Sequence, residues 1–214
     1  RITTVLHNRG FLLNHKTVQR LMKQLGLICR VRIKKYRSYK GEVGKIAPNL
    51  LNQDFHTEKP NQKWVTDVTE FSLFGQKLYL SPILDLHNGY LVSYSISDRP
   101  VLSMVTTMLN KAFERIPDGT GLILHSDQGW QYQHKQYQRM LREKGIQQSM
   151  SRKGNCLDNA VMENFFGLLK SELLYLQEFE SMQHFLDYYN NRRIKAKLMG
   201  LPPAIHRQQA LSVA

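Results

Sequence analysis

The chain has 214 residues, 42% of them hydrophobic and 22% charged, which is an ordinary globular composition with enough length for one sizeable core or two modest domains. Its formal net charge of +13 and its pI near 9.8 indicate a polyanionic partner, although many soluble proteins simply carry a solvated basic surface. No stretch approaches the roughly 20 apolar residues that span a bilayer and no signal peptide is present, so we expect no membrane partner.

The excess positive charge is concentrated in the first third of the chain. Residues 1–63 contain 14 Lys and Arg against three Asp and Glu, whereas residues 64–214 contain 16 against 14. A basic surface that only served solubility would not need this segregation. The distribution therefore favours a nucleic acid as the partner of the N-terminal third.

Residues 1–28 are predicted to form two short helices. The first covers about residues 2–7 and ends at Gly10; the second follows Asn14, a good N-cap, and ends at Gly26. Apolar residues recur in the second helix with i, i+3, i+4, i+7 spacing, at Val18, Leu21, Met22 and Leu25. We interpret the pair as a helix-turn-helix-like segment whose candidate DNA contacts are Lys16, Arg20 and Lys23; the alternative is a surface helix pair packed on the core.

Residues 29–62 are predicted to form a basic linker. Between residues 30 and 40, basic side chains alternate with aliphatic and tyrosine side chains, a pattern that suits phosphate contacts with occasional stacking on a base or sugar. A disordered, solvated linker would have the same composition. The candidate DNA contacts here are Arg30, Arg32, Lys34, Lys35 and Arg37.

An α/β core is predicted to follow, over residues 63–200, with a C-terminal tail at 201–214. Its opening strands cover about residues 63–73, 77–86 and 90–97, and Asn88-Gly89 is a strong hairpin signal. Then come a helix at 101–116, a strand at 121–126, a helix at 131–144, a strand at 146–150 and a helix that contains Glu163. This order predicts a mixed five-stranded sheet flanked by helices.

Three acidic residues carry the candidate chemistry: Asp67, Asp127 and Glu163, with 35 residues between the last two. Asp67 and Asp127 lie in or directly after apolar, β-branched runs that are typical of buried strands. Converging carboxylates repel one another and raise their own pKa values unless a cation lies between them. The cations that prefer such oxygen ligands are Mg²⁺ and Mn²⁺.

The helix that contains Glu163 is predicted to have one polar and one apolar face. At 100° per residue, Glu163 and Lys170 share a face with Asn159. The predicted core-facing stripe lies opposite and consists of Leu157, Val161, Phe165 and Leu168. A solvated helix face would show the same pattern.

The segment before this helix offers further candidates. Arg152, Lys153 and Gly154 suggest a basic loop that contacts DNA, although a plain exposed loop fits equally well. Asp158 and Asn159 are expected to cap the helix. His125, at the end of a strand, is expected to be structural rather than a substrate contact.

Four ordered motifs resemble those of a known family. They are Trp64-Val65-Thr66-Asp67, His125-Ser126-Asp127-Gln128-Gly129, Leu157-Asp158-Asn159-Ala160 with Glu163, and Tyr189-Asn190-Asn191-Arg192-Arg193. Together with the 35-residue gap, they resemble the insertion-sequence transposases with a retroviral-integrase-type, Asp-Asp-35-Glu catalytic core. More narrowly, the chain is similar to the second-frame protein of such elements.

The resemblance implies a ribonuclease-H-like core and a catalytic metal site. Asp67, Asp127 and Glu163 would be the catalytic residues and would hold Mg²⁺ or Mn²⁺, as two ions. Lys170 would bind DNA near the cleaved phosphate, and Asn159 would lie beside the site and also contact DNA. Retroviral integrases carry a His-His-Cys-Cys zinc module before this core, but His7 and His15 precede only one nearby cysteine, Cys29, so that module is not expected here.

The resemblance also implies the partners. They are double-stranded DNA, both the terminal inverted repeats of the element and the target, further copies of the chain in a multimer on DNA, and an upstream-frame protein of the same element. With only two cysteines, a reducing bacterial cytoplasm and association with the nucleoid are expected. Because the chain begins with Arg1 rather than Met, we expect a fragment or a processed product.

The sequence therefore predicts a DNA transposase that cleaves and transfers strands at the ends of an insertion element. Two alternatives stay open at this point. One is a catalytically idle DNA-binding relic of such an element, and the other is a ribonuclease-H-type nuclease acting on hybrid duplexes.

Overall fold

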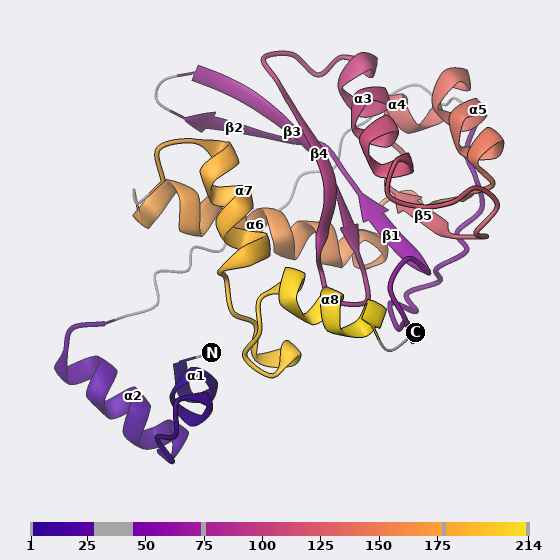
Figure 1. Cartoon of the computed structure of the whole chain (residues 1–214). Helices are drawn as coiled ribbons and strands as arrows, with labels where there is room; N and C mark the ends of the chain where they lie inside the picture. The colour runs from indigo at the N-terminus through magenta and orange to yellow at the C-terminus, as the bar shows by residue number, and fades with distance from the viewer. Residues whose placement is uncertain (1, 28–44, 74–75, 177–178, 213–214) are drawn as a thin grey trace. The chain divides into compact units, whose positions relative to one another are not determined.

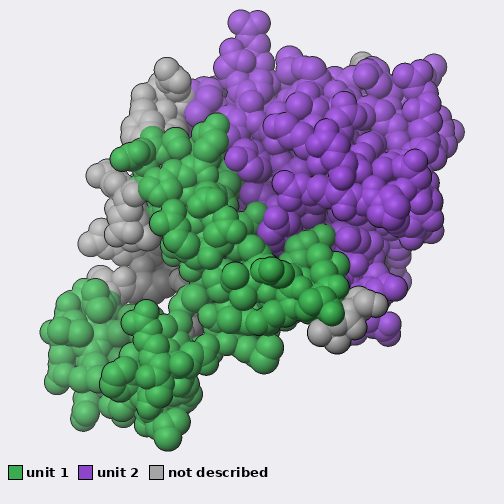
Figure 2. Space-filling model, in the orientation of Figure 1, with its two compact units in different colours: residues 1–34, 171–214 green, residues 35–170 purple. Residues whose placement is uncertain are grey.

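A computed structural model describes residues 2–27, 45–73, 76–176 and 179–212 (Figure 1). The chain divides into two compact units: residues 1–34 with 171–214, and residues 35–170 (Figure 2). The three candidate acids belong to the second unit. The candidate DNA contacts between Arg30 and Arg37 lie outside the described residues.

The second unit is built on a mixed sheet of six strands. They are β1 (Lys63–Thr66), β2 (Thr69–Leu73), β3 (Gln76–Asp85), β4 (Leu91–Ser97), β5 (Ile123–Ser126) and β6 (Gln147–Met150). The long strand β3 pairs antiparallel with β1, β2 and β4, whereas β1 pairs parallel with β5 and β5 parallel with β6. The predicted α/β arrangement with a mixed sheet is confirmed.

The sheet has six strands rather than the predicted five because the first predicted strand is interrupted at Asp67. Both fragments lie along the same edge of β3: Ile83 pairs with Thr66 and Ser93, and Tyr79 pairs with Glu70 and Ser97, so β4 occupies the other edge throughout. At the interruption the carboxylate of Asp67 accepts a hydrogen bond from the backbone N–H of Val68 at 2.7 Å. The acid thus leaves the strand ladder while the chain continues along β3.

One face of the sheet is covered by α3 (Leu102–Phe113), α4 (Trp130–Gln133) and α5 (Lys135–Lys144), which lie together in Figure 1. Trp64, Ile83 and Leu124 from the strands are fully buried with Met108 and Tyr137 from these helices. The single helix predicted at 131–144 is two helices, because His134 adopts an extended backbone and its ring accepts a hydrogen bond from the N–H of Gln136, capping α5.

Residues 45–62, predicted as part of a linker, are hydrogen-bonded within the second unit. The N–H of Leu50 donates to Ser149 Oγ at 2.8 Å, and the N–H of Met150 donates to the carbonyl of Pro48 at 3.2 Å. Leu51 is buried. This segment therefore runs against the end of β6, whereas the predicted boundaries at residues 28, 62 and 200 stay predictions.

The predicted apolar stripe of the last core helix is partly wrong. A 3₁₀ turn, η1 (Cys156–Asn159), precedes α6 (Ala160–Leu176), and Leu157 in that turn is 60% exposed. The buried side chains of α6 are Met162, Phe165, Phe166, Leu169 and Leu173. Apolar residues occupy almost every side of this helix, so the sequence pattern alone could not identify the buried stripe. In addition, the tighter 3₁₀ turn rotates the chain by more than 100° per residue, which changes the predicted direction of Leu157.

The first unit contains five short helical segments in its described part. They are α1 (Ile2–Asn8), α2 (His15–Gln24), α7 (Met182–Asn191), η2 (Ala196–Leu198) and α8 (Pro203–Ser212). The prediction for α2 is confirmed: Asn14 accepts a hydrogen bond from the N–H of Lys16 at 3.0 Å, and Gly26 follows the helix with φ of +68°. No helix in the described ranges is long and apolar enough to cross a membrane.

The motif at residues 189–193 has a structural function at its last arginine. Arg193 is buried, and its Nε and Nη2 atoms each donate a hydrogen bond to the carboxylate of Glu172 at 2.8 Å. The preceding Arg192 instead forms an exposed ion pair with Asp187 at 3.5 Å. Nearby, Lys195 donates a hydrogen bond to Tyr189 Oη, and burial lowers the pKa of Lys195 to about 7.

The two adjacent arginines give a matched test of this packing. Arg193→Ala should lower the free energy of unfolding by about 3–5 kcal/mol, because it removes the cation that donates two hydrogen bonds to the mostly buried carboxylate of Glu172. Arg192→Ala should cost less than about 1 kcal/mol, since its pair with Asp187 is solvent-exposed. Urea denaturation of both variants measures the difference; equal costs would mean that the Arg193–Glu172 pair does not stabilise the unit.

Candidate active site

Asp67 and Asp127 meet at one edge of the sheet because β1 and β5 run parallel. Val65 is paired with His125, and each acid lies two residues beyond its paired residue, just past the end of its strand. Neighbouring parallel strands end at the same edge, so the two carboxylates are brought together although 59 residues separate them along the chain. The two acids therefore follow neighbouring central strands of the sheet.

The turn after Asp127 is shaped around its carboxylate. Asp127 Oδ1 accepts a hydrogen bond from the N–H of Gly129 at 2.8 Å. A Cβ atom at Gly129 would lie 2.9 Å from that oxygen and 2.8 Å from Gln131 Nε2, closer than real Cβ contacts allow. A side chain at position 129 would therefore displace the Asp127 carboxylate or the Gln131 amide, whereas glycine leaves both in place.

Glu163 reaches the same region through the 3₁₀ turn that precedes its helix. Asn159, at the end of η1, donates a hydrogen bond from Nδ2 to Asp67 Oδ2 at 3.0 Å. Glu163 follows four residues later, one turn into α6, and is exposed. The hydrogen bond thus joins the start of the Glu163 helix to the first acid.

The three carboxylates influence one another's protonation. Burial, and then the negative charges of Asp127 and Glu163, raise the pKa of Asp67 well above its ordinary value, although hydrogen bonds from Val68 and Asn159 oppose this. Burial also raises the pKa of Asp127 and of Glu163. Acids in this state bind a proton or a cation more readily than isolated surface acids do.

Two buried tyrosines lie near the Asp67–Asp127 pair. Tyr132 and Tyr137 are fully buried with their rings in edge-to-face contact, 5.3 Å between centroids. Burial raises the pKa of both phenols, and the charge of Asp127 adds to this in each case, which indicates that they lie close to the carboxylates. Sequence reasoning missed them, because the only signal was tyrosine on the helical segment that follows Asp127.

The chemistry of the donor set suits a hard divalent cation. Asp67 and Asp127 meet at one edge of the sheet, and the charge of Glu163 acts on Asp67. Hydrogen bonds from Gly129 and Asn159 fix the orientation of the first two carboxylates. In the described residues, no three His, Cys, Asp or Glu side chains lie close enough together to form a ready metal-binding group. Because like charges separate when nothing compensates them, the acids fit a cation that draws them together.

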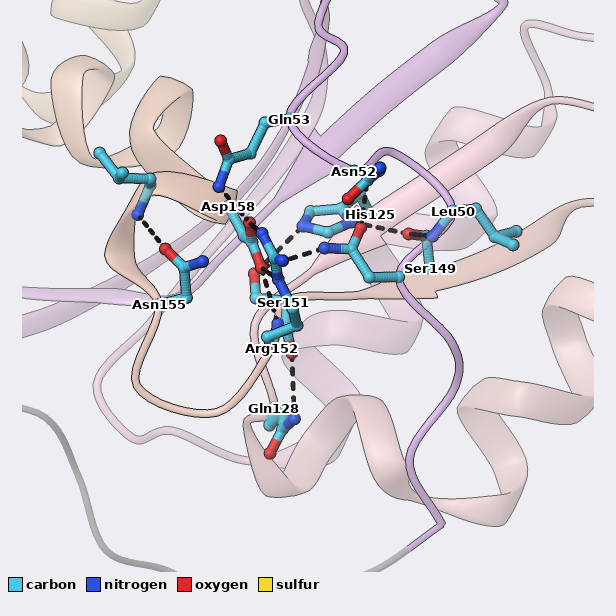
Figure 3. Close-up of polar contacts among 12 residues, drawn as sticks. Leu50, Asn52, Gln53, His125, Gln128, Ser149, Ser151, Arg152, Asn155 and Asp158 are labelled. Carbon is cyan, nitrogen blue, oxygen red and sulfur yellow. Dashed lines mark hydrogen bonds and ion pairs between the residues drawn. The ribbon is translucent and has the colours of Figure 1, made fainter.

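A second polar cluster surrounds Asp158 (Figure 3). This carboxylate is buried and accepts hydrogen bonds from Asn49 Nδ2, Gln53 Nε2 and three groups of Arg152: the backbone N–H, Nε and Nη2, all between 2.8 and 3.1 Å. The side-chain hydrogen bonds of Arg152 hold the pKa of Asp158 well below its usual range. Asp158 is therefore a buried anion that joins the 45–54 segment to the turn before α6.

The predicted capping function of Asp158 and Asn159 is wrong. The side chain that caps η1 is that of Asn155, whose Oδ1 accepts from the N–H of Leu157 at 3.1 Å. Asp158 and Asn159 use their side chains for contacts with Arg152 and Asp67 instead. Caps and long-range acceptors use the same residue types, so the sequence could not distinguish them.

His125 is structural, as expected. Its ring is fully buried, with Nδ1 2.8 Å from Ser149 Oγ and Nε2 3.1 Å from Ser151 Oγ. Burial lowers its pKa to about 4. Figure 3 shows the ring beside the Asp158 cluster, where it links β5 to β6.

The other predicted DNA contacts are spread over both units. Lys170 is half-buried on α6, two turns beyond Glu163. Hydrogen bonds from Lys77 and Tyr79 lower the pKa of Glu70, and the charge of Lys170 adds to this. Lys153 is exposed in the loop before η1, whereas the guanidinium of Arg152 contacts Asp158. Lys16, Arg20 and Lys23 are exposed on α2 in the first unit. The structure therefore brings Asn159 to the acids, and the contacts on α2 belong to a different unit.

Comparisons with known proteins agree with this architecture. Residues 57–156 and 163–211 match families described as integrase core domain, and residues 1–35 match an HTH-like domain. The structure is similar to the HTLV-2 integrase catalytic core domain in complex with magnesium, with a TM-score of 0.53 and 19% identity over 72% of this chain and 99% of that one. The fold is thus that of an integrase catalytic core, which is ribonuclease-H-like.

Relatives of higher identity define the family more narrowly. The chain is 55% identical to the putative transposase InsK for insertion sequence element IS150 of Escherichia coli K12, over 98% of this chain and 76% of that protein. It is 51% identical to an uncharacterized transposase-like protein of Haemophilus influenzae, over 94% of this chain and 95% of that protein. The chain belongs to the insertion-sequence transposases, as its four motifs indicated.

The Asp158 cluster has a testable effect on stability. Asp158→Asn should lower the free energy of unfolding by about 2 kcal/mol at neutral pH, because it removes charge-assisted hydrogen bonds to Arg152. A carboxylate with a depressed pKa in the folded state contributes stability above its unfolded pKa of about 4, and this contribution is lost as the pH falls through the folded value. The difference between the two proteins should therefore be constant from pH 7 to 5 and shrink below pH 4.

Urea denaturation of both proteins across this pH range measures the effect. A difference in unfolding free energy that stayed the same down to pH 3 would show that the ionised carboxylate is not what stabilises the turn.

Proposed function

We propose that this transposase uses Asp67, Asp127 and Glu163 to cleave DNA strands at the terminal inverted repeats of its element and to transfer them to target DNA. The observation that carries the proposal is the meeting of Asp67 and Asp127 at the ends of parallel strands, with the Glu163 helix tied to Asp67 through Asn159. The 35-residue spacing between Asp127 and Glu163 supports the same assignment.

The three acids would hold Mg²⁺ or Mn²⁺, as two ions. When bound, such ions activate a water molecule or a 3′-hydroxyl and stabilise charge on the phosphate that is attacked. Asp67 and Asp127 would be the half-buried, oriented ligands, since each already accepts a backbone hydrogen bond. Glu163 is exposed and would complete the site from the helix side when DNA is bound.

Cleavage and strand transfer can share this site because both are displacements at phosphorus that differ only in the attacking oxygen. Both would proceed without a covalent protein–DNA intermediate, so neither Tyr132 nor Tyr137 is needed as a nucleophile. Their full burial and raised pKa values agree with this. The retained triad argues against an idle DNA-binding relic, and membership of the transposase family argues against a hybrid-specific nuclease.

DNA would be held mainly by the basic N-terminal third. The exposed Lys16, Arg20 and Lys23 lie at i, i+4 and i+7 on α2, so they share one face of that helix. The proposal also includes Lys170 as a phosphate contact, a homo-multimer that bridges two element ends, and an upstream-frame protein of the element. An enzyme of this kind would act on DNA in the bacterial nucleoid.

The catalytic assignment is tested by amide substitutions. Asp67→Asn, Asp127→Asn and Glu163→Gln should each slow metal-dependent cleavage of an element end about a thousandfold or more, because each removes a metal ligand. DNA binding in a gel-shift assay should survive, and Asp98→Asn, an exposed acid just beyond β4, should cleave like the wild type. Cleavage retained by Asp127→Asn would refute the assignment.

The DNA-binding assignment is tested by two triple variants of equal charge. Replacing Lys16, Arg20 and Lys23 by Ala should weaken binding to an element end and reduce the log–log salt slope by about 0.9 for each phosphate that the variant no longer neutralises. Lys135, Arg139 and Arg142 on α5 are also exposed, with the same spacing and the same total charge, so their triple Ala variant is the control. Equal weakening in the two variants would mean that only net charge matters and that α2 has no special part in binding.

A further inference from the structure

Asn159 occupies a place in the site that its expected role, a DNA contact, does not explain. Its side chain is buried, 7% exposed, and its Nδ2 atom donates to Asp67 Oδ2 at 3.0 Å. Its Oδ1 atom is buried and accepts no hydrogen bond from any residue in the described part of the chain. The amide thus points its donor at a carboxylate of the triad instead of presenting it to solvent.

The neighbouring residue fixes the backbone from which Asn159 projects. Asp158 is 1% exposed and accepts a hydrogen bond from Asn49. It is also held by Gln53 and Arg152, as Figure 3 shows. Because five donors converge on this one carboxylate, η1 is attached to the 45–54 segment and to the end of β6. Asn159 therefore extends from an anchored turn.

The same turn sets the position of the third acid. Helix α6 begins at Ala160, and Glu163 lies one helical turn from Asn159. The hydrogen bond from Asn159 to Asp67 is thus a direct link between the element that carries the third acid and the loop that carries the first. The 3.0 Å length of this hydrogen bond limits how far the start of α6 can lie from the loop that contains Asp67.

We propose that Asn159 is a positioning residue, which orients Asp67 and holds the Glu163 helix against it, and that Asp158 anchors Asn159 in this role. The proposal rests on the function proposed above, since Asn159 would affect metal binding by positioning Asp67 and Glu163, two of the proposed metal ligands. An amide suits the position, because it donates a hydrogen bond without adding a fourth negative charge. Groups that orient metal ligands in this way typically change metal affinity or activity by about 10–100-fold when they are removed.

The test measures cation binding without DNA and without turnover. The melting temperature of the whole chain is recorded against Mg²⁺ concentration, and half-saturation is read from the rise in Tm. Asn159→Ala should raise the Mg²⁺ concentration at half-saturation about tenfold or more, and Asn159→Leu, which keeps the side-chain volume, should do the same. The Leu variant separates the effect of the missing hydrogen bond from that of any cavity that the Ala variant creates.

Asn155→Ala is the matched control, because it removes the cap of the same 3₁₀ turn without touching Asp67. It should lower the Tm in the absence of Mg²⁺ but leave half-saturation unchanged. Equal half-saturation in wild type, Asn159→Ala and Asn159→Leu would overturn the positioning role. A shift in Asn155→Ala as large as that in the Asn159 variants would overturn it too, since general loosening of the turn would then explain both.

Failure of this inference can be told apart from failure of the proposed function. If Asp67→Asn and Asp127→Asn abolish the Mg²⁺-dependent rise in Tm while the Asn159 variants behave as wild type, the triad stands and only the positioning role falls. If Asp67→Asn and Asp127→Asn leave that rise intact, the metal assignment itself is wrong.

Discussion

Parallel pairing of β1 with β5 places two carboxylates side by side at the end of the sheet, and much of the surrounding structure offsets the repulsion that results. Burial and mutual charge raise the pKa of Asp67, whereas backbone N–H groups of Val68 and Gly129 and the amide of Asn159 stabilise the two ionised acids. The strands that lead to Asp67 and Asp127 are packed against α3, α4 and α5, which fixes the edge of the sheet at which the two acids lie.

A second anion, Asp158, shows how differently a buried carboxylate behaves when its donors are supplied by the protein. Five hydrogen bonds, three of them from Arg152, keep it ionised with a low pKa. Asp67 is hydrogen-bonded to Asn159, the residue that follows Asp158. It receives fewer hydrogen bonds than Asp158 does, and its pKa is raised. The contrast separates a structural acid, whose charge is fully hydrogen-bonded by the protein, from an acid that receives too few donors to offset its burial.

The segment at residues 45–62 supports the candidate site from outside the sheet. Its Asn49 and Gln53 donate hydrogen bonds to Asp158, the residue before Asn159. This segment therefore helps to fix the turn that precedes α6.

The sequence by itself determined the α/β class, the helix pair with Asn14 as cap and the structural nature of His125, because these depend on short-range patterns. Its motif spacing also selected the three acids as candidates for the site. Only the tertiary structure decided that the first strand breaks at Asp67, which side chains of α6 are buried, and that Asp158, Asn159, Arg152 and Arg193 bind other residues of the protein. Each of these outcomes depends on a partner far away in the chain. An Asn that caps a helix and an Asn that orients a distant carboxylate look the same in sequence, since what separates them is the position of an acceptor 92 residues away.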